Sequence, residues 1–293
     1  MTDRNDTIAG PAEGGPDRGD RREFLRKAGL GGVAAGTLWA APSILSLDAA
    51  YAAGTCGSGT SSFAWSTGGN NTRYNTAGKV GTTTTANIDI RIIATAQNGV
   101  FNAGILGHNW MTRAAATGAL NCGSAATTDY PMGNEASFYT LQMHNSAPSN
   151  NNCGGNGTAG RWAEVEFGFF DAGTTTPHAV RSLGFKLLDV DNASYTDQAE
   201  VFVNGSGTRA TTGAGGIFTT VTLGGGVTQP TAGTARFVGT GNTAANSAAS
   251  NVTLGSNNST DITSVRVRFT DILAGGPTSI QWIGIGDLTF CKV

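Results

Sequence analysis

The sequence predicts an all-β protein: an antiparallel β-sandwich of the jelly-roll or lectin-like kind, with long polar loops. Short runs rich in β-branched and aromatic residues recur along residues 53–293. Several of these runs alternate between apolar and polar side chains, and clusters of Gly, Asn, Ser and Pro separate them. Short strands spaced by such turn signals are typical of a sandwich.

Ten segments carry the strand pattern. In Val265–Phe269 and Trp162–Phe167 every second side chain shares a face, as in a half-buried strand. Gly107–Leu120 is a weak helix candidate because glycines interrupt it. The ten expected strands are Ile88–Ala96, Ser137–Met143, Trp162–Phe170, Leu183–Val190, Ala199–Val203, Ile217–Leu223, Ala235–Val238, Val265–Phe269, Ile280–Ile285 and Leu288–Phe290.

The first 52 residues predict export rather than a folded domain. Residues 1–20 are polar and contain almost no large apolar side chain, so we expect them to be disordered. Residues 21–52 combine a basic cluster, an uncharged run and a small-residue pattern, the plan of a cleaved export signal. Arg21, Arg22, Phe24 and Leu25 resemble the twin-arginine export motif, which implies folding before translocation.

A retained membrane anchor is the alternative, since the uncharged run Ala28–Leu47 is just long enough to span a bilayer. The run is only weakly apolar, Pro42 interrupts it, and a cleavage pattern follows. Cleavage after Ala52 or Ala53 is therefore favoured, and contact with the membrane is expected only during export. No linker divides residues 53–293, which we expect to form a single β-sandwich domain that is secreted or displayed on the cell surface.

Charge argues against two classes of partner. Residues 1–52 hold 6 of the 18 basic and 7 of the 20 acidic residues, which leaves 12 and 13 in the exported part. A chain this close to neutral, without a basic run, is not expected to bind nucleic acid or anionic lipid. No nucleotide is expected either: the chain has no P-loop, and the GNGTAG string at residues 155–160 leads into a strand rather than a helix.

Four cysteines lie in the exported part, and four allow three pairings. We expect Cys56 to pair with Cys291, because they lie near the two ends of that part. Cys122 and Cys153 bracket a loop-like segment and form the second expected pair. A zinc site is the alternative, but the spacing of a zinc motif is absent and export implies an oxidising environment.

Acidic residues gather in the stretch LLDVDNASYTDQAEVFVNG, residues 187–205. Strand alternation puts Asp189 and Asp191 on the same face as Leu187, so they would extend a core face to its rim. Ca²⁺ prefers oxygen ligands of this kind. The sequence thus favours a structural rim whose carboxylates are satisfied by backbone groups or arginines, and a calcium site is the alternative. The candidate ligands are Asp189, Asp191, Asn192 and Asp197.

Two segments resemble lectin-like β-sandwich domains of bacterial surface adhesins. One is Leu183–Val203, an apolar run followed by D-V-D, a polar loop, an Asp and an alternating strand. The other is the closing segment Ser264–Phe290. The resemblance implies a surface that binds carbohydrate or a surface protein, with Asp189, Asp191 and Asp197 as its acidic rim.

The function expected from these features is an extracellular binding module for glycan or matrix, more an adhesion protein than an enzyme. Trp65, Trp110 and Tyr195 are the expected exposed aromatics for stacking on sugar, whereas Trp162 and Trp282 are expected in the core. A secreted glycoside hydrolase with two facing carboxylates is one alternative. A structural coat protein without a ligand is the other.

Overall fold

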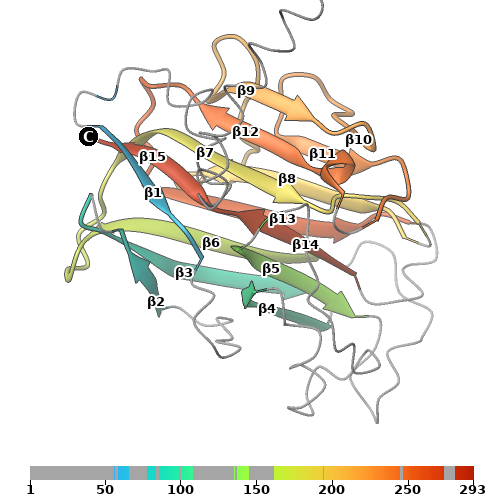
Figure 1. Ribbon diagram of the computed structural model, residues 1–293, viewed down its shortest axis with the longest axis horizontal. Coiled ribbons are helices and arrows are strands. Elements are labelled where there is room, and N and C mark those ends of the chain that lie inside the picture. Colours follow the sequence, from blue (N-terminus) through green and yellow to red (C-terminus); the bar gives the residue numbers. More distant parts are fainter. Residues whose placement is uncertain are drawn as a thin grey trace, which may run out of the picture. The chain divides into compact units, whose positions relative to one another are not determined.

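Fifteen strands and one short 3₁₀ turn, Ala248–Ser250, make up the regular structure of the part that the computed structural model describes (Figure 1). That part comprises residues 56, 59–65, 78–83, 86–98, 100–107, 135, 137–144, 162–193, 195–244, 247–273 and 281–293. All of it falls within one compact unit, Ser43–Val293. Within it, no helix is long and apolar enough to cross a membrane.

Several sequence expectations fall outside the described residues. They concern the disordered residues 1–20, the export signal of residues 21–52 with Arg21, Arg22, Phe24 and Leu25, and residues 108–120 of the helix candidate. Trp110 and the Cys122–Cys153 pair lie outside them as well.

One sheet has eight strands. The path β1-β15-β7-β14-β5-β4 is extended on the other side of β7 by β12 and then β9. All its pairings are antiparallel. Its strands are β1 (Thr60–Phe63), β4 (Val100–Gly107), β5 (Ser137–His144), β7 (Val180–Leu188), β9 (Phe218–Leu223), β12 (Val252–Ser256), β14 (Gln281–Gly286) and β15 (Leu288–Lys292).

The second sheet has seven strands in the order β10-β11-β8-β13-β6-β3-β2, again antiparallel. Its strands are β2 (Gly78–Thr82), β3 (Ile88–Asn98), β6 (Trp162–Asp171), β8 (Asp197–Val203), β10 (Val227–Thr228), β11 (Arg236–Gly239) and β13 (Ser264–Asp271). The expected antiparallel sandwich is confirmed, and each of the ten expected strands is present.

The core lies between the two sheets because alternate side chains of both point inward. Phe185 and Phe290 of the eight-stranded sheet belong to the same buried cluster as Phe167, Phe169 and Phe269 of the seven-stranded sheet. Edge-on ring pairs cross the layer, such as Phe169 with Phe290 at 5.4 Å between ring centroids. Burial of these large apolar surfaces drives the sandwich together.

The strands β14 and β15 run along the same side of β7, and only Asp287 interrupts them. Trp65 follows β1 and lies at this interruption. Its indole N–H donates to the carbonyl of Gly286 at 2.9 Å, and its backbone N–H donates to Asp287 at 3.1 Å. Trp65 is only 1% exposed and packs against the Tyr139 ring. The expectation that Trp65 is exposed for sugar stacking is therefore wrong.

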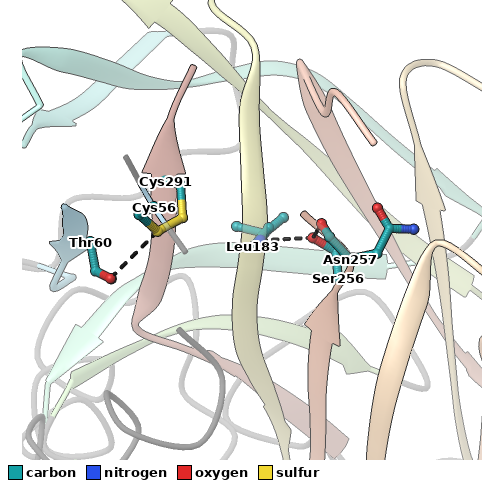
Figure 2. The surroundings of a disulfide bond; sticks show 6 residues. All are labelled: Cys56, Thr60, Leu183, Ser256, Asn257 and Cys291. Atoms are coloured by element: carbon teal, nitrogen blue, oxygen red, sulfur yellow. Dashed lines mark hydrogen bonds between the residues drawn. A yellow bond between two sulfur atoms is a disulfide. The ribbon is translucent and has the colours of Figure 1, made fainter. Parts of the chain in front are cut away.

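The expected Cys56–Cys291 disulfide is confirmed, with 5.4 Å between the two Cα atoms (Figure 2). Cys291 belongs to β15 and is paired with Thr60 of β1, the strand that follows Cys56. The bond therefore ties the first described strand to the last one, where the two already lie side by side.

Candidate functional site

The strand β7 ends abruptly before the acidic stretch. Asp189 adopts a left-handed backbone conformation, with φ of 61°, which Asp tolerates better than most residues. The predicted strand Leu183–Val190 therefore stops at Leu188, and Asp189 and Asp191 do not continue its alternation. They are buried nonetheless, because the chain turns there from the eight-stranded sheet into the seven-stranded one.

A closed turn joins β7 to β8. The backbone N–H of Asp197 donates to the carbonyl of Asp191 at 3.0 Å, and Asn192 pairs with Thr196. The end of β11 lies tightly against this turn, since a Cβ on Gly239 would come within 2.1 Å of the Asp191 carbonyl oxygen. A glycine is therefore required at 239, and the turn holds Asp191 and Asp197 at the same end of the sandwich.

Asp271, which the sequence analysis missed, joins this group. In the β8–β13 pair it lies directly opposite Asp197, and both side chains follow the inward face of their strands. Directly opposed side chains in an antiparallel pair are close neighbours, and like charges there are destabilising. We call Asp189, Asp191, Asp197 and Asp271 the carboxyl cluster; its members are 6%, 2%, 1% and 0% exposed.

Neutral donors partly satisfy the cluster. Trp282 and Ser250 donate to Asp189, and the Tyr195 hydroxyl donates to Asp191. Asp271 Oδ1 accepts the backbone N–H groups of Thr196 at 3.1 Å and Leu273 at 2.9 Å. No ion pair among the described residues reaches the cluster. One oxygen of each carboxyl is buried without a partner: Asp189 Oδ1, Asp191 Oδ1, Asp197 Oδ1 and Asp271 Oδ2.

Burial and mutual repulsion shift the acidity of the cluster. Burial, together with the charge of Asp191, raises the pKa of Asp189 to about 8. Burial and the charges of Asp191 and Asp189 raise the pKa of Asp197 well above its ordinary value. Burial also raises the pKa of Asp191 and that of Asp271. Carboxyl groups in such surroundings take up protons or a cation, because leaving them bare is expensive.

Asp89 is another buried carboxylate, but nearby cations compensate its negative charge. Asp89 is fully buried, but Lys79 at 2.9 Å and Arg91 at 2.8 Å form ion pairs with it. Although burial alone would raise its pKa, hydrogen bonds from Thr82, Arg91 and Lys79 hold the pKa of Asp89 well below its ordinary value. The carboxyl cluster has no such cations.

The candidate calcium ligands thus meet the chemistry of a cation site only in part. Asp189, Asp191 and Asp197 come together at one end of the sandwich, as the sequence predicted, and Asn192 lies in the same turn. Among the described residues, however, no three His, Cys, Asp or Glu side chains are grouped so that they could hold a metal ion. A calcium ion would need the carboxyl groups to turn toward a common point, or ligands from backbone oxygens and water.

The outer face of the seven-stranded sheet is the second candidate. Side chains that alternate with the core residues point away from the eight-stranded sheet. In one row across β11, β8, β13 and β6, Arg236 lies opposite Glu200, which lies opposite Arg268, which lies opposite Glu164. We call this outer face of the seven-stranded sheet the charged face. Its side chains are Trp162, Glu164, Glu166, Gln198, Glu200, Phe202, Arg236, Ser264, Arg266, Arg268 and Thr270.

Ion pairs and stacked rings order the charged face. Arg268 donates through Nε to Glu164 at 2.8 Å and lies over the Trp162 ring, with Cζ 4.5 Å from its centroid. Arg266 lies over Phe202 at 4.4 Å. Cation–π contacts of this kind hold the guanidinium groups against the rings. Glu200 is only 3% exposed and forms an ion pair with Arg209.

The expected aromatic residues are distributed differently from the prediction. Tyr195 is half-buried, and its hydroxyl is engaged by Asp191. Trp162 is half-buried on the charged face rather than in the core, because its neighbour Ala163 takes the inward position. Trp282 is likewise half-buried. Alternation around Ala163 and Val201 places Trp162 and Phe202 on the outward side of the sheet, where Trp162 is half-buried and Phe202, beneath Arg266, is only 5% exposed.

No family model matches the chain, and no curated protein matches it. Among solved structures, it is similar to the K1 cleaved adhesin domain of Lys-gingipain from Porphyromonas gingivalis W83. The identity is 11%, the match covers 80% of this chain and 99% of that one, and the TM-score is 0.27. A likeness at this TM-score establishes neither a shared fold nor a shared function.

Proposed function

We propose that the chain is an exported binding module, secreted or displayed on the cell surface, that attaches to glycan or matrix through its charged face. The supporting observation is that this face combines Trp162 and Phe202 with stacked arginines and nearly buried carboxylates on a sheet. Export through residues 21–52 by the twin-arginine route belongs to the same proposal.

Preorganisation is the physical argument for binding. Ion pairs with Glu164 and Glu200 restrict Arg268 and Arg209, and the Phe202 ring restricts Arg266. Side chains that are already ordered lose less entropy when a ligand binds. Aromatic rings and arginines are also the residues that dominate binding energy at recognition surfaces. A face that only contacts solvent needs neither ordered arginines nor aromatic rings.

A glycoside hydrolase is less well supported. Glu164 and Glu200 flank Arg268 on neighbouring strands, so a pair of carboxyl groups does occur on the charged face. Strand spacing places them about 10 Å apart, near the upper limit for an inverting enzyme. Each already forms an ion pair with an arginine, Arg268 or Arg209. Because both carboxylates are engaged by arginines, neither is available to protonate a glycosidic oxygen or to activate water. We therefore propose binding without catalysis.

Replacing Trp162 with alanine is expected to abolish most glycan binding. The substitution removes a half-buried ring and releases the Arg268 guanidinium that lies over it. Stacking on an aromatic ring contributes about 1 kcal/mol or more, so affinity should fall at least about fivefold. Binding of residues 53–293 and its variants to a glycan array and to immobilised matrix proteins provides the measurement.

Trp162→Phe is the matched control, because it keeps a ring for both the sugar and Arg268. It should retain most of the affinity, while thermal melting verifies that both variants fold. Equal binding by wild type and Trp162→Ala would contradict the role of the charged face. If the wild type binds nothing on either surface, the coat-protein alternative is favoured instead.

We also propose that Ca²⁺ occupies the carboxyl cluster outside the cell and stabilises the β7–β8 turn, with Asp189, Asp191, Asn192 and Asp197 as ligands. The unpartnered buried carboxyl oxygens of Asp189, Asp191 and Asp197 support this proposal. Ca²⁺ would supply the positive charge that ion pairs supply to Asp89. It would also compete with the protons that the raised pKa values favour.

Calcium at a hundred times its dissociation constant is expected to stabilise the protein by about 3 kcal/mol at pH 8. For a domain of this size, that corresponds to a rise in Tm of about 5–10 °C over the same sample in EDTA. Differential scanning calorimetry at pH 8 checks this. Asp191→Asn should lose most of the calcium-dependent shift, and Asp261→Asn, on an exposed ion pair elsewhere, should keep it. A Tm that is the same in calcium and in EDTA would show that protons alone satisfy the cluster.

A further inference from the structure

We infer that the ligand of the charged face is an acidic polysaccharide, one that carries uronate carboxylates or sulfate groups. This inference rests on the proposed function, since it names the ligand class for the same face. Three features of the face favour such a ligand: the balance of charge on that side of the sheet, the contacts of Arg236 and the rings beneath Arg266 and Arg268.

Positive charge is in excess on the outer side of the seven-stranded sheet, although the whole chain is slightly acidic, with 18 basic and 20 acidic residues. Among the described residues on that side and in the loop after β8, six side chains are basic and four are acidic. The basic ones are Lys79, Arg91, Arg209, Arg236, Arg266 and Arg268, and the acidic ones are Asp89, Glu164, Glu166 and Glu200.

The pairing pattern shows where this excess lies. Lys79 and Arg91 share Asp89, and Arg266 and Arg268 share Glu164. Glu166 accepts a hydrogen bond from the Ser264 hydroxyl at 2.6 Å. Asp89 and Glu164 each carry one negative charge, and each pairs with two cations. Positive charge therefore remains for an anion to neutralise.

Arg236 is the strongest single candidate for contact with that anion. It is half-buried on β11, next to the short edge strand β10, and donates through Nε to Gln198 Oε1 at 2.7 Å. Gln198 is neutral, so this contact orients the guanidinium without cancelling its charge. An oriented guanidinium recognises carboxylate and sulfate oxygens with paired hydrogen bonds.

A polysaccharide fits the rest of the face better than a small anion would. Trp162 lies under Arg268 and Phe202 lies under Arg266, on strands β6 and β8 that flank β13. Rings and guanidinium groups therefore extend over several strands. Because guanidinium groups cover these rings and Phe202 is only 5% exposed, a chain of sugar rings would place its acidic groups on the arginines and an apolar ring face against the half-buried Trp162.

The test compares three soluble polymers by isothermal titration calorimetry with residues 53–293: polygalacturonate, dextran sulfate and unmodified dextran. We expect binding to at least one acidic polymer, weakening as salt is added, and none to dextran. Arg236→Gln should lower affinity for that polymer about tenfold, because it removes a charge-assisted contact. Arg236→Lys keeps the charge but not the planar fork and should lie in between.

Arg181→Gln is the matched control, since it removes the same charge from β7 of the other sheet. It should bind like the wild type. Binding of polygalacturonate alone, of dextran sulfate alone or of both shows which acidic group is recognised. Equal losses in Arg236→Gln and Arg181→Gln would overturn the inference, because the attraction would then be non-specific. Binding to neutral glycans only, on the glycan array or to dextran, would overturn it and leave the proposed function standing. Binding to no glycan or polymer would overturn both.

Discussion

Replacing Cys56 and Cys291 together with serine is expected to lower the free energy of unfolding by about 5 kcal/mol, on the chain-entropy model. The two cysteines are 235 residues apart in sequence, so the disulfide removes a large loop-closure entropy from the unfolded chain. For a domain of this size, we expect Tm to fall by about 10–20 °C. Thermal denaturation of residues 53–293 under non-reducing conditions, followed by circular dichroism, gives the measurement.

The single variant Cys291→Ser is the control for the bond itself, because it should lose as much stability as the double variant. Serine is nearly isosteric, so the pairing of β1 with β15 should persist and the folded spectrum should be unchanged. A Tm within about 3 °C of the wild type, less than 1–2 kcal/mol at this size, would mean that the unfolded chain is already compact enough for the bond to add little.

Alternation explains how much of the fold could be predicted. In strands such as Trp162–Asp171 and Ser264–Asp271 every second side chain belongs to the core, and this alternation is visible in the sequence. Three of the missed strands are too short or too rich in glycine to show it clearly. Gly78–Thr82 and Val252–Ser256 are short and carry glycines, and Val227–Thr228 has only two residues. Pairing with neighbouring strands defines them, and that information lies elsewhere in the chain.

The candidate sites depended still more on contacts between distant residues. Asp189, Asp191 and Asp197 are close in sequence, so their grouping could be predicted. Asp271 is brought to them only by the register of β13 against β8. Trp65 was expected at the surface, but hydrogen bonds to Gly286 and Asp287, more than 220 residues away in sequence, hold it at the interruption between β14 and β15. The charged face was missed because its charges alternate with core residues over four strands and form no cluster in sequence.

The carboxyl cluster is expected to make the metal-free protein less stable as pH rises from 4 to 8. Asp189 has an ordinary pKa of 3.8 when the chain is unfolded and a pKa of about 8 when it is folded. Between these values the folded protein holds a proton that the unfolded chain has lost, so the free energy of unfolding falls with increasing pH. The stabilisation is complete below pH 3.8 and is lost as pH approaches 8; for Asp189 alone it is on the order of 5 kcal/mol.

Asp189→Asn should remove the part of this dependence that Asp189 contributes and raise stability at pH 8. Asparagine also tolerates the left-handed conformation at φ of 61°, and its amide oxygen can accept a hydrogen bond from Trp282 or Ser250. In EDTA, we expect the wild type to melt at a lower temperature at pH 8 than at pH 5, and the variant to change much less. Asp261→Asn, which removes an exposed carboxylate paired with Arg181, should follow the wild type. If the metal-free wild type is more stable at pH 8 than at pH 5, the carboxyl groups are ionised and satisfied in the folded state. That result would contradict raised pKa values in the carboxyl cluster.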